Sequence, residues 1–331
     1  MCNLKDYKSF LFVLPFLFLL NNNDASNNNE SNNIAVEELS LNETQFSHIK
    51  GISNPFSYRC YMNAVLQYFM SDPFILERLL KYDGNDSNIN IFREIALVYV
   101  NSNGKVATGK LNEMLKRLEL SKGRQEDASE FLMRRCEALL SQLGLHPNGH
   151  IMANYLDKEK VYNLTQYFDK NDELSRDVEF KKIGKDYYKR MDLLFEKRFI
   201  VSQDETADNI LIPINRSSNS FFGKIQLANN TRIDIPDYLM ISDEKYFLDF
   251  IIVHIGRALN SGHYIAYRVV RDKDGSRKKI VLMDDENVYV KDEFSDEQLN
   301  GEYYGINRKA VFVSYKKCNE SSKTEIRLPI T

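Results

Sequence analysis

Three residue types that cooperate in nucleophilic catalysis stand far apart in this chain. Cys60 supplies a thiol, His263 an imidazole and Asp284 a carboxylate. A thiolate attacks a carbonyl carbon, an imidazole moves the proton, and a carboxylate orients the imidazole and stabilises its charged form. The combination predicts a thiol-dependent acyl-transfer enzyme such as a cysteine peptidase.

The residues after Cys60 predict a helix that would position the thiol. Apolar side chains recur on one face at helical spacing, at Met62, Val65, Leu66, Phe69 and Met70. Cys60 then opens the helix, and a helix N-terminus stabilises a thiolate. A lone cysteine is more often a small buried hydrophobe, so the prediction depends on the flanking motifs.

The region around His263 predicts a β-hairpin that brings the imidazole to a carboxylate. Strand patterns flank the turn signal Asp274-Gly275, over 264–270 and 280–283. A turn centred between these two residues sets residue 263 opposite residue 286, with Asp284 two places away on the same face. Diagonal neighbours lie about 7–8 Å apart at Cα, within reach of a side-chain hydrogen bond. Taken by itself, the pair is more often a strand-end histidine beside a solvated acidic turn.

Helical patterns precede strand patterns along the chain. Further helices are expected over 111–120 and 128–143, the second with Asp127 and Glu130 as a capping pair. Further strands are expected over 210–214, 246–255 and 311–315. This order predicts an α+β fold. His254, inside an apolar strand, is expected to be a hydrogen-bonded structural residue.

Composition narrows the class of protein. The 331 residues are 43% hydrophobic and 27% charged, enough apolar material for a real core, and the net charge of −3 argues against a general nucleic-acid binder. The four cysteines form no C-x-x-C pair, so neither structural zinc nor a disulfide framework is predicted. Sparse cysteines favour a reducing compartment, and we expect a cytoplasmic or nuclear protein.

The N-terminal region does not fit a cytoplasmic or nuclear protein as simply. Residues 10–20 are an apolar run, shorter than the roughly 20 residues that span a bilayer but as long as a signal-peptide core. A secretory address and a simple apolar extension are equally consistent with it, and membrane association is expected only if this run acts as a signal or anchor. We expect an apolar signal-like segment, an Asn-rich disordered linker, a catalytic domain and a tail, over 1–20, 21–47, 48–317 and 318–331.

Five segments resemble, in order, the ubiquitin-specific protease family of deubiquitinating cysteine peptidases. They correspond to its cysteine box, its Gln-Asp-Ala helix, its histidine box, its acidic segment and its closing strand, at 51–67, 125–132, 246–267, 283–288 and 310–315. The resemblance covers roughly 48–317. It implies a papain-like fold with a helical thumb and a β-rich palm.

The same resemblance implies roles for individual residues. Cys60 is the nucleophile, His263 the general base and acid, Asp284 its orienter and Asp285 a helper. The residues implied to bind the C-terminal tail of ubiquitin are Gln125, Asp127 and Tyr264. The implied partners are ubiquitin and ubiquitinated proteins, with no cofactor and no metal.

The loop before Cys60 departs from the family. The family carries an oxyanion-binding Asn five residues before its cysteine, where this chain has Pro55. Asn54 lies one residue further away, and an extra loop residue could restore it to position. Without that donor, the rate would fall by on the order of 10²–10³. The residue next to the cysteine is Arg59 instead of the family's Thr, and we expect it on the solvent side.

Two other departures concern packing and metal. Residues 195–214 resemble the segment around the family's zinc-binding fingers but contain no cysteine, so short, metal-free fingers are expected. Met283 replaces an aromatic residue ahead of the acidic pair, which is a tolerable packing change.

Three functions follow from these patterns. The leading one is hydrolysis of the isopeptide, peptide or thioester bond at the C-terminal glycine of ubiquitin through an acyl-enzyme thioester. The second is a catalytically weak or inactive ubiquitin-binding scaffold, suggested by the altered loop. The third, suggested only by residues 10–20, is a secreted cysteine protease of general specificity.

Overall fold

The computed structural model describes the part of the chain that carries the expected catalytic residues. The described residues are 46, 48–106, 108–119, 123–145, 151–152, 161–164, 208–219, 226–241, 244–271, 278–301 and 305–318. The chain divides into two compact units, Met1–Ser47 and His48–Thr331, and the account below concerns the second. The signal-like segment, nearly all of the linker and of the tail, and the expected fingers up to residue 207 lie outside the described residues.

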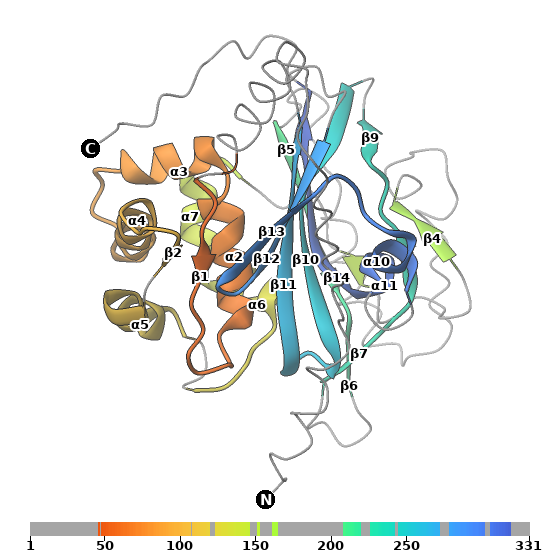
Figure 1. The fold of residues 1–331 in the computed structure, drawn as a ribbon, viewed down its shortest axis with the longest axis horizontal. Coiled ribbons are helices and arrows are strands. Elements are labelled where there is room, and N and C mark those ends of the chain that lie inside the picture. The colour runs from red at the N-terminus through yellow and green to blue at the C-terminus, as the bar shows by residue number, and fades with distance from the viewer. Residues whose placement is uncertain are drawn as a thin grey trace, which may run out of the picture. The chain divides into compact units, whose positions relative to one another are not determined.

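Helices make up the first part of this unit. They are α2 (Cys60–Met70), α3 (Pro73–Leu80), α4 (Ser87–Val100), α5 (Thr108–Leu118), α6 (Ala128–Arg135) and α7 (Glu137–Gln142). All eleven residues of α2 are buried, because α2 contacts α3, α6 and the strands β10 (Glu244–Ala258), β11 (Ser261–Arg271) and β12 (Lys278–Asp284). Figure 1 shows α2 next to the sheet, with α4 and α5 further out. Among the described residues, no helix has the length and apolar character needed to cross a bilayer.

Capping side chains account for several helix starts, among them those of α3 and α6. The Asp72 carboxylate accepts from the backbone N–H groups of Phe74 and Ile75 at 2.9 and 3.1 Å, and Pro73 takes the first helical position of α3. The expected Asp127 cap is confirmed, since its carboxylate accepts from the Glu130 N–H at 3.0 Å.

One expected helix is interrupted. The prediction of a continuous helix over 128–143 is wrong, because the backbone leaves the helical region at Cys136 with φ −98° and ψ 4°. The physical reason is packing: α6 contacts α2 and the sheet, whereas α7 contacts α4. A bend between them lets each half bury its own apolar face.

Strands make up the rest. The main sheet has the order β13-β12-β11-β10-β14-β5-β3, with β6, β7 and β9 branching from it. Its strands are β3 (Ile151–Met152), β5 (Asn209–Asn215), β6 (Ser217–Asn219), β7 (Gln226–Ala228), β9 (Tyr238–Ile241), β10 (Glu244–Ala258), β11 (Ser261–Arg271), β12 (Lys278–Asp284), β13 (Asn287–Lys291) and β14 (Ala310–Lys317). The predicted α+β class is confirmed.

Short elements complete the described fold. They are the parallel pairs β1 (Gly51–Ile52) with β2 (Lys105–Val106) and β4 (Val161–Asn163) with β8 (Arg232–Asp234), and the helices α10 (Asp296–Asn300) and α11 (Ile306–Lys309). The helix α11 contacts β8 and β10, and β1 contacts β13.

The predicted hairpin register is confirmed. β11 pairs antiparallel with β12, with Ala266 opposite Met283 and Val269 opposite Ile280. Extending this register sets residue 263 opposite residue 286, as the turn signal predicts. The next hairpin, in which β12 turns into β13, was not predicted from the sequence.

A buried ion cluster joins the helices to the sheet. Arg268 of β11 donates to both oxygens of Asp249 at 2.8 and 2.9 Å and to the Tyr68 carbonyl of α2 at 2.8 Å. Its Nη1 also lies 3.5 Å from Asp72, and its Nε donates to Ser71 at 2.7 Å. A buried guanidinium is tolerated when it is paired and fully hydrogen-bonded. The cluster therefore fixes the end of α2 against β11.

Candidate active site

The thiol and the imidazole meet where α2 contacts β11. Cys60 is the first residue of α2 and is fully buried, and no side chain caps this helix end. The imidazole of His263 lies close enough to the Cys60 side chain to interact with its sulfur. The structure thus brings together two residues that are about 200 positions apart in the sequence.

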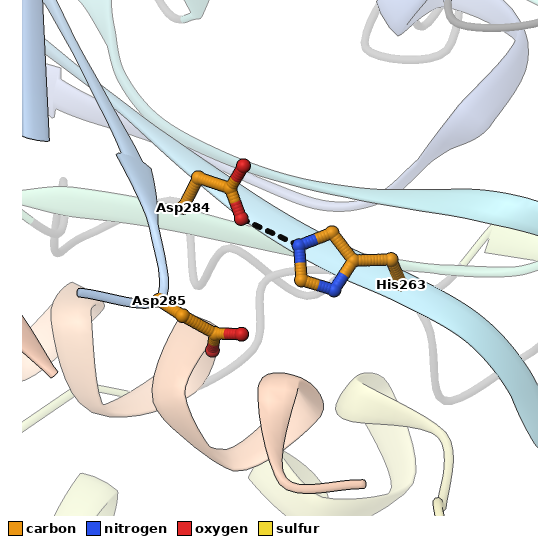
Figure 2. Close-up of side chains that lie close together, drawn as sticks. All are labelled: His263, Asp284 and Asp285. Carbon is orange, nitrogen blue, oxygen red and sulfur yellow. Dashed lines mark hydrogen bonds and ion pairs between the residues drawn. The ribbon is translucent and has the colours of Figure 1, made fainter. Parts of the chain in front are cut away.

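His263 also contacts the expected carboxylate. Its Nε2 lies 2.5 Å from Asp284 Oδ1, the pair joined by the dashed line in Figure 2. Since Nε2 faces the carboxylate, Nδ1 is the ring nitrogen left for the thiol. Gly262 places the ring here with a φ of 122°, and a Cβ at this position would lie 2.5 Å from the Ile255 carbonyl oxygen.

The surroundings of His263 favour its protonated form. Burial alone would lower its pKa, but hydrogen bonds to Asp284 and Cys60, and their negative charges, outweigh this effect and raise the pKa to about 10. The side chains of His263 and Asp284 are 36% and 40% exposed, so solvent screens part of this interaction. The imidazole is therefore suited to hold a proton beside a thiolate.

Asp285 contacts the nucleophile's side of the site. Its carboxylate accepts from Asn54 Nδ2 at 3.0 Å and from Asn63 Nδ2 at 2.8 Å, and its carbonyl accepts from the Ile52 N–H at 2.7 Å. Burial raises the pKa of Asp285, which has a left-handed φ of 49°. In Figure 2, no dashed line joins it to His263 or Asp284. The contacts of Asp285 thus support Asn54 and α2 instead of the imidazole.

Asn54 lies beside the start of α2 despite the altered spacing. Its Oδ1 accepts from the Arg59 N–H at 3.3 Å, and one hydrogen of its Nδ2 goes to Asp285. The second Nδ2 hydrogen and the backbone N–H of Cys60 have no hydrogen-bond acceptor among the described residues. Ser57, with a left-handed φ of 58°, lies in the turn that accommodates the extra residue.

The expectation that Arg59 faces solvent is wrong. Its side chain is 1% exposed and forms an ion pair with Glu119, just after α5. The rings of Phe56 and Tyr58 lie against the guanidinium, and the sequence pattern did not predict their positions. A buried carboxylate 60 positions away supplies the counter-charge, and nothing in the local pattern indicates that partner.

The expected tail-binding residues have different exposures. Gln125 has a buried Nε2 without a partner among the described residues, so it keeps a free donor. Asp127 caps α6, and burial raises its pKa to about 6. Tyr264 is 1% exposed, and its hydroxyl donates to the Leu259 carbonyl at 2.9 Å. It therefore presents almost no surface to a ligand, and its role in tail binding stays a prediction.

His254 has the structural character that the sequence predicts. Its Nε2 lies 3.1 Å from the Ser261 carbonyl oxygen, and its ring packs 4.7 Å from that of Tyr264. Burial lowers its pKa to about 4, so the ring is neutral at physiological pH.

One group of side chains has the spacing of a metal site. One ligand atom from each of His263, Asp284 and Asp285 lies within 4.8 Å of the others. All three side chains already share hydrogen bonds with one another or with Asn54 and Asn63. The group therefore fits proton transfer better than metal binding.

Two residues that contact the site, Asn63 and Glu119, were not predicted from the sequence. Asn63 lies in the cysteine box at 51–67. Its position three residues after Cys60 in the same helix could have indicated that it lies near the thiol. Glu119 follows the last turn of α5 and had no signal at all.

Comparison with known proteins places the chain in a family. The family described as ubiquitin carboxyl-terminal hydrolase matches residues 50–305. A search of curated proteins gave no match. The SAGA Ubp8/Sgf11/Sus1/Sgf73 DUB module bound to ubiquitin aldehyde is similar in fold, with a TM-score of 0.51 and 15% identity over 86% of this chain and 75% of that chain. An essential yeast splicing factor gives a TM-score of 0.49 and 14% identity over 82% and 70%, and this weaker likeness carries no argument. Because the family match spans most of its length, this chain belongs to the ubiquitin carboxyl-terminal hydrolase family.

Proposed function

We propose that this protein is a cysteine-dependent deubiquitinase that hydrolyses the bond between the C-terminal glycine of ubiquitin and an amine. The observation that carries the proposal is the convergence of Cys60, His263 and Asp284 at one site. The imidazole is hydrogen-bonded to Asp284 and interacts with the Cys60 sulfur. Family membership supplies the substrate class. Together they favour catalysis over binding alone.

The geometry supports a two-step reaction. The thiol proton passes to His263 Nδ1, and the thiolate attacks the glycine carbonyl carbon to form a tetrahedral oxyanion. The oxyanion collapses as His263 gives its proton to the leaving amine, which leaves a Cys60 thioester. A water molecule then loses a proton to His263 and attacks the thioester, releasing the glycine carboxylate and the thiol.

Two donors are available for the oxyanion. They are the backbone N–H of Cys60 and the second Nδ2 hydrogen of Asn54. Asp285 and the Arg59 N–H hold the Asn54 amide from its two ends, so its orientation is set before substrate arrives. Preorganised donors of this kind stabilise the transition state without further reorganisation.

Two residues at the start of α6 support recognition of the ubiquitin tail. Gln125 offers an unused amide donor, and Asp127 offers a carboxylate fixed as a helix cap. A buried amide without a partner is costly unless a ligand satisfies it. We propose that the extended C-terminal segment of ubiquitin binds beside the start of α6.

A second candidate is a ubiquitin-binding scaffold without turnover. The altered loop favours it, since Pro55 occupies the position at which the family carries its oxyanion-binding residue. The contacts of Asn54 favour the enzyme instead, because the amide lies next to Arg59 and Asp285.

The test uses ubiquitin that carries a C-terminal electrophile, together with a fluorogenic ubiquitin amide. We expect a covalent adduct and turnover with the wild-type protein, and neither with Cys60→Ala. Cys136→Ala is the matched control, because this buried cysteine lies between α6 and α7 and has no place in the reaction. Tight ubiquitin binding without turnover would support the scaffold, and cleavage of unfolded casein would support a general protease.

A further inference from the structure

A buried ion pair holds the loop before Cys60, and it involves neither His263 nor Asp284. Arg59 Nε donates to Glu119 Oε1 at 2.7 Å, and its Nη2 lies 2.5 Å from the same oxygen. The two side chains are 1% and 6% exposed. Burying two charges costs desolvation free energy, which only close pairing and further hydrogen bonds can offset.

Three other side chains complete the environment of the guanidinium. Arg59 Nη1 donates to Asn112 Oδ1 at 2.8 Å. The rings of Phe56 and Tyr58 lie 5.1 and 5.2 Å from the guanidinium carbon, and the Tyr58 hydroxyl donates to Glu119 at 3.2 Å. Two loop residues and two residues of the α5 region thus restrain one side chain. Lysine could not reproduce these contacts, because it lacks the planar fork of donors.

The main chain of Arg59 lies between the two candidate oxyanion donors. Its N–H donates to Asn54 Oδ1 at 3.3 Å, and its carbonyl accepts from the Asn63 N–H at 3.0 Å. Its peptide carbonyl carbon is bonded to the Cys60 nitrogen. Any shift of Arg59 therefore moves the Asn54 amide and the Cys60 N–H together.

The rest of the loop is held by the Asn54–Asp285 hydrogen bond and by a turn in which the Ser57 N–H donates to the Asn54 carbonyl at 3.2 Å. It belongs to no helix or strand, and Ser57 has a left-handed φ of 58° without being glycine. The side-chain contacts of Arg59 supply the rigidity that regular hydrogen bonding supplies elsewhere.

We propose that Arg59 is a positioning residue for the oxyanion site, anchored by Glu119, and that it compensates for the altered loop. This inference rests on the proposed deubiquitinase function. Arg59 would act on the transition state through the placement of two donors, without touching the substrate. The guanidinium would leave thiol reactivity unchanged, because Glu119 neutralises it.

The test separates oxyanion stabilisation from thiol reactivity and substrate binding. In Arg59→Lys and Glu119→Gln, we expect kcat to fall by about 10–10², less than the 10²–10³ for complete loss of a donor, with KM unchanged. Affinity for ubiquitin aldehyde should fall by a similar factor, because its adduct places an oxygen at the oxyanion position. Affinity for unmodified ubiquitin and the rate of Cys60 alkylation by iodoacetamide should stay the same, because neither involves an oxyanion.

Leu115→Ala is the matched control. Leu115 is buried on α5 and takes no part in the ion pair, so its truncation destabilises the same helix without removing the anchor. We expect Leu115→Ala to lower the melting temperature while kcat stays near the wild-type value.

Several results would overturn the inference. One is a kcat within threefold of wild type in both Arg59→Lys and Glu119→Gln, measured per folded molecule. Others are a parallel fall in the alkylation rate, or an equal loss of kcat in Leu115→Ala. A wild-type protein with no turnover would instead remove the proposed function, and this inference with it.

Discussion

The two halves of the candidate active site are built in different ways. The histidine half is a regular hairpin, in which the pairing of β11 with β12 places His263 and Asp284. The cysteine half is an irregular loop followed by a buried helix, and long-range side-chain pairs hold it. Backbone ladders define one half, and buried polar groups define the other.

This difference predicts how each half responds to substitution. A ladder tolerates many side-chain changes because its hydrogen bonds belong to the backbone. A loop held by Arg59, Glu119 and Asp285 depends on each of those side chains. Substitutions in the histidine half should therefore change proton transfer, and those in the cysteine half should change oxyanion stabilisation.

The turn after β12 connects the two halves. Asp285 in this turn bonds to Asn54, Asn63 and the backbone of Ile52. Gly51 allows this close approach, because a Cβ there would lie 2.1 Å from the Glu286 carbonyl oxygen. Asp285 thus couples the position of the loop before Cys60 to the position of the hairpin.

The largest expected effect is in the histidine half. His263→Ala should lower kcat by about 10³ or more, because general acid–base catalysis contributes roughly 10²–10⁴ and the thiolate also loses its counter-charge. Stopped-flow turnover of a fluorogenic ubiquitin amide measures this. A loss below tenfold would show that another group moves the proton.

The next effect tests the cysteine half. Asn54→Ala should lower kcat by about 10²–10³ with little change in KM, because it removes one oxyanion donor. The rate of iodoacetamide alkylation should be preserved, in contrast to His263→Ala. If both variants slow alkylation equally, the two halves are not functionally distinct.

Asp284→Asn should have a smaller effect, because the amide oxygen can still accept from Nε2 while the charge is lost. Loss of the charge weakens the interaction that stabilises the imidazolium by about 1.4 kcal/mol for each pKa unit, and we expect kcat to fall by about tenfold. The alkaline limit of kcat/KM, set by the imidazolium pKa of about 10, should move to lower pH.

Asp284→Asn should also change how the free energy of unfolding depends on pH. The folded-state pKa of His263 is raised above its usual 6.5, so its contribution is complete below about pH 6.5 and is lost as pH rises through about 10. Urea unfolding across this range should show a decline in the wild-type protein and a flatter profile in Asp284→Asn. Solvent screening keeps the effect modest, because both side chains are more than a third exposed.

The smallest effect on catalysis should come from the ion cluster that joins the helices to the sheet. Arg268→Met leaves Asp249 and Asp72 without their shared cation, although Lys316 still lies 3.2 Å from Asp72. Breaking a buried pair costs about 3–5 kcal/mol, so the free energy of unfolding should fall by about that amount. The kcat per folded molecule should change less than threefold, and a large loss would make Arg268 part of the catalytic geometry.

The sequence by itself determined α2, the central strands and the histidine half. The period of the apolar residues predicted α2 and the main strands, and the turn signal predicted the register that sets Asp284 near His263. These features are local, because the side-chain period and the turn depend on neighbouring residues. Family motifs also predict catalytic roles for Cys60 and Asn54.

Only the tertiary structure decided how the cysteine half is held. Spacing did not reveal the burial of Arg59 against Glu119 or the contacts of Asp285 with Asn54 and Asn63. Each of these depends on a partner from a distant part of the chain. Whether a polar side chain is exposed or buried depends on that partner, because burial is stable only when the charge or hydrogen bond is satisfied.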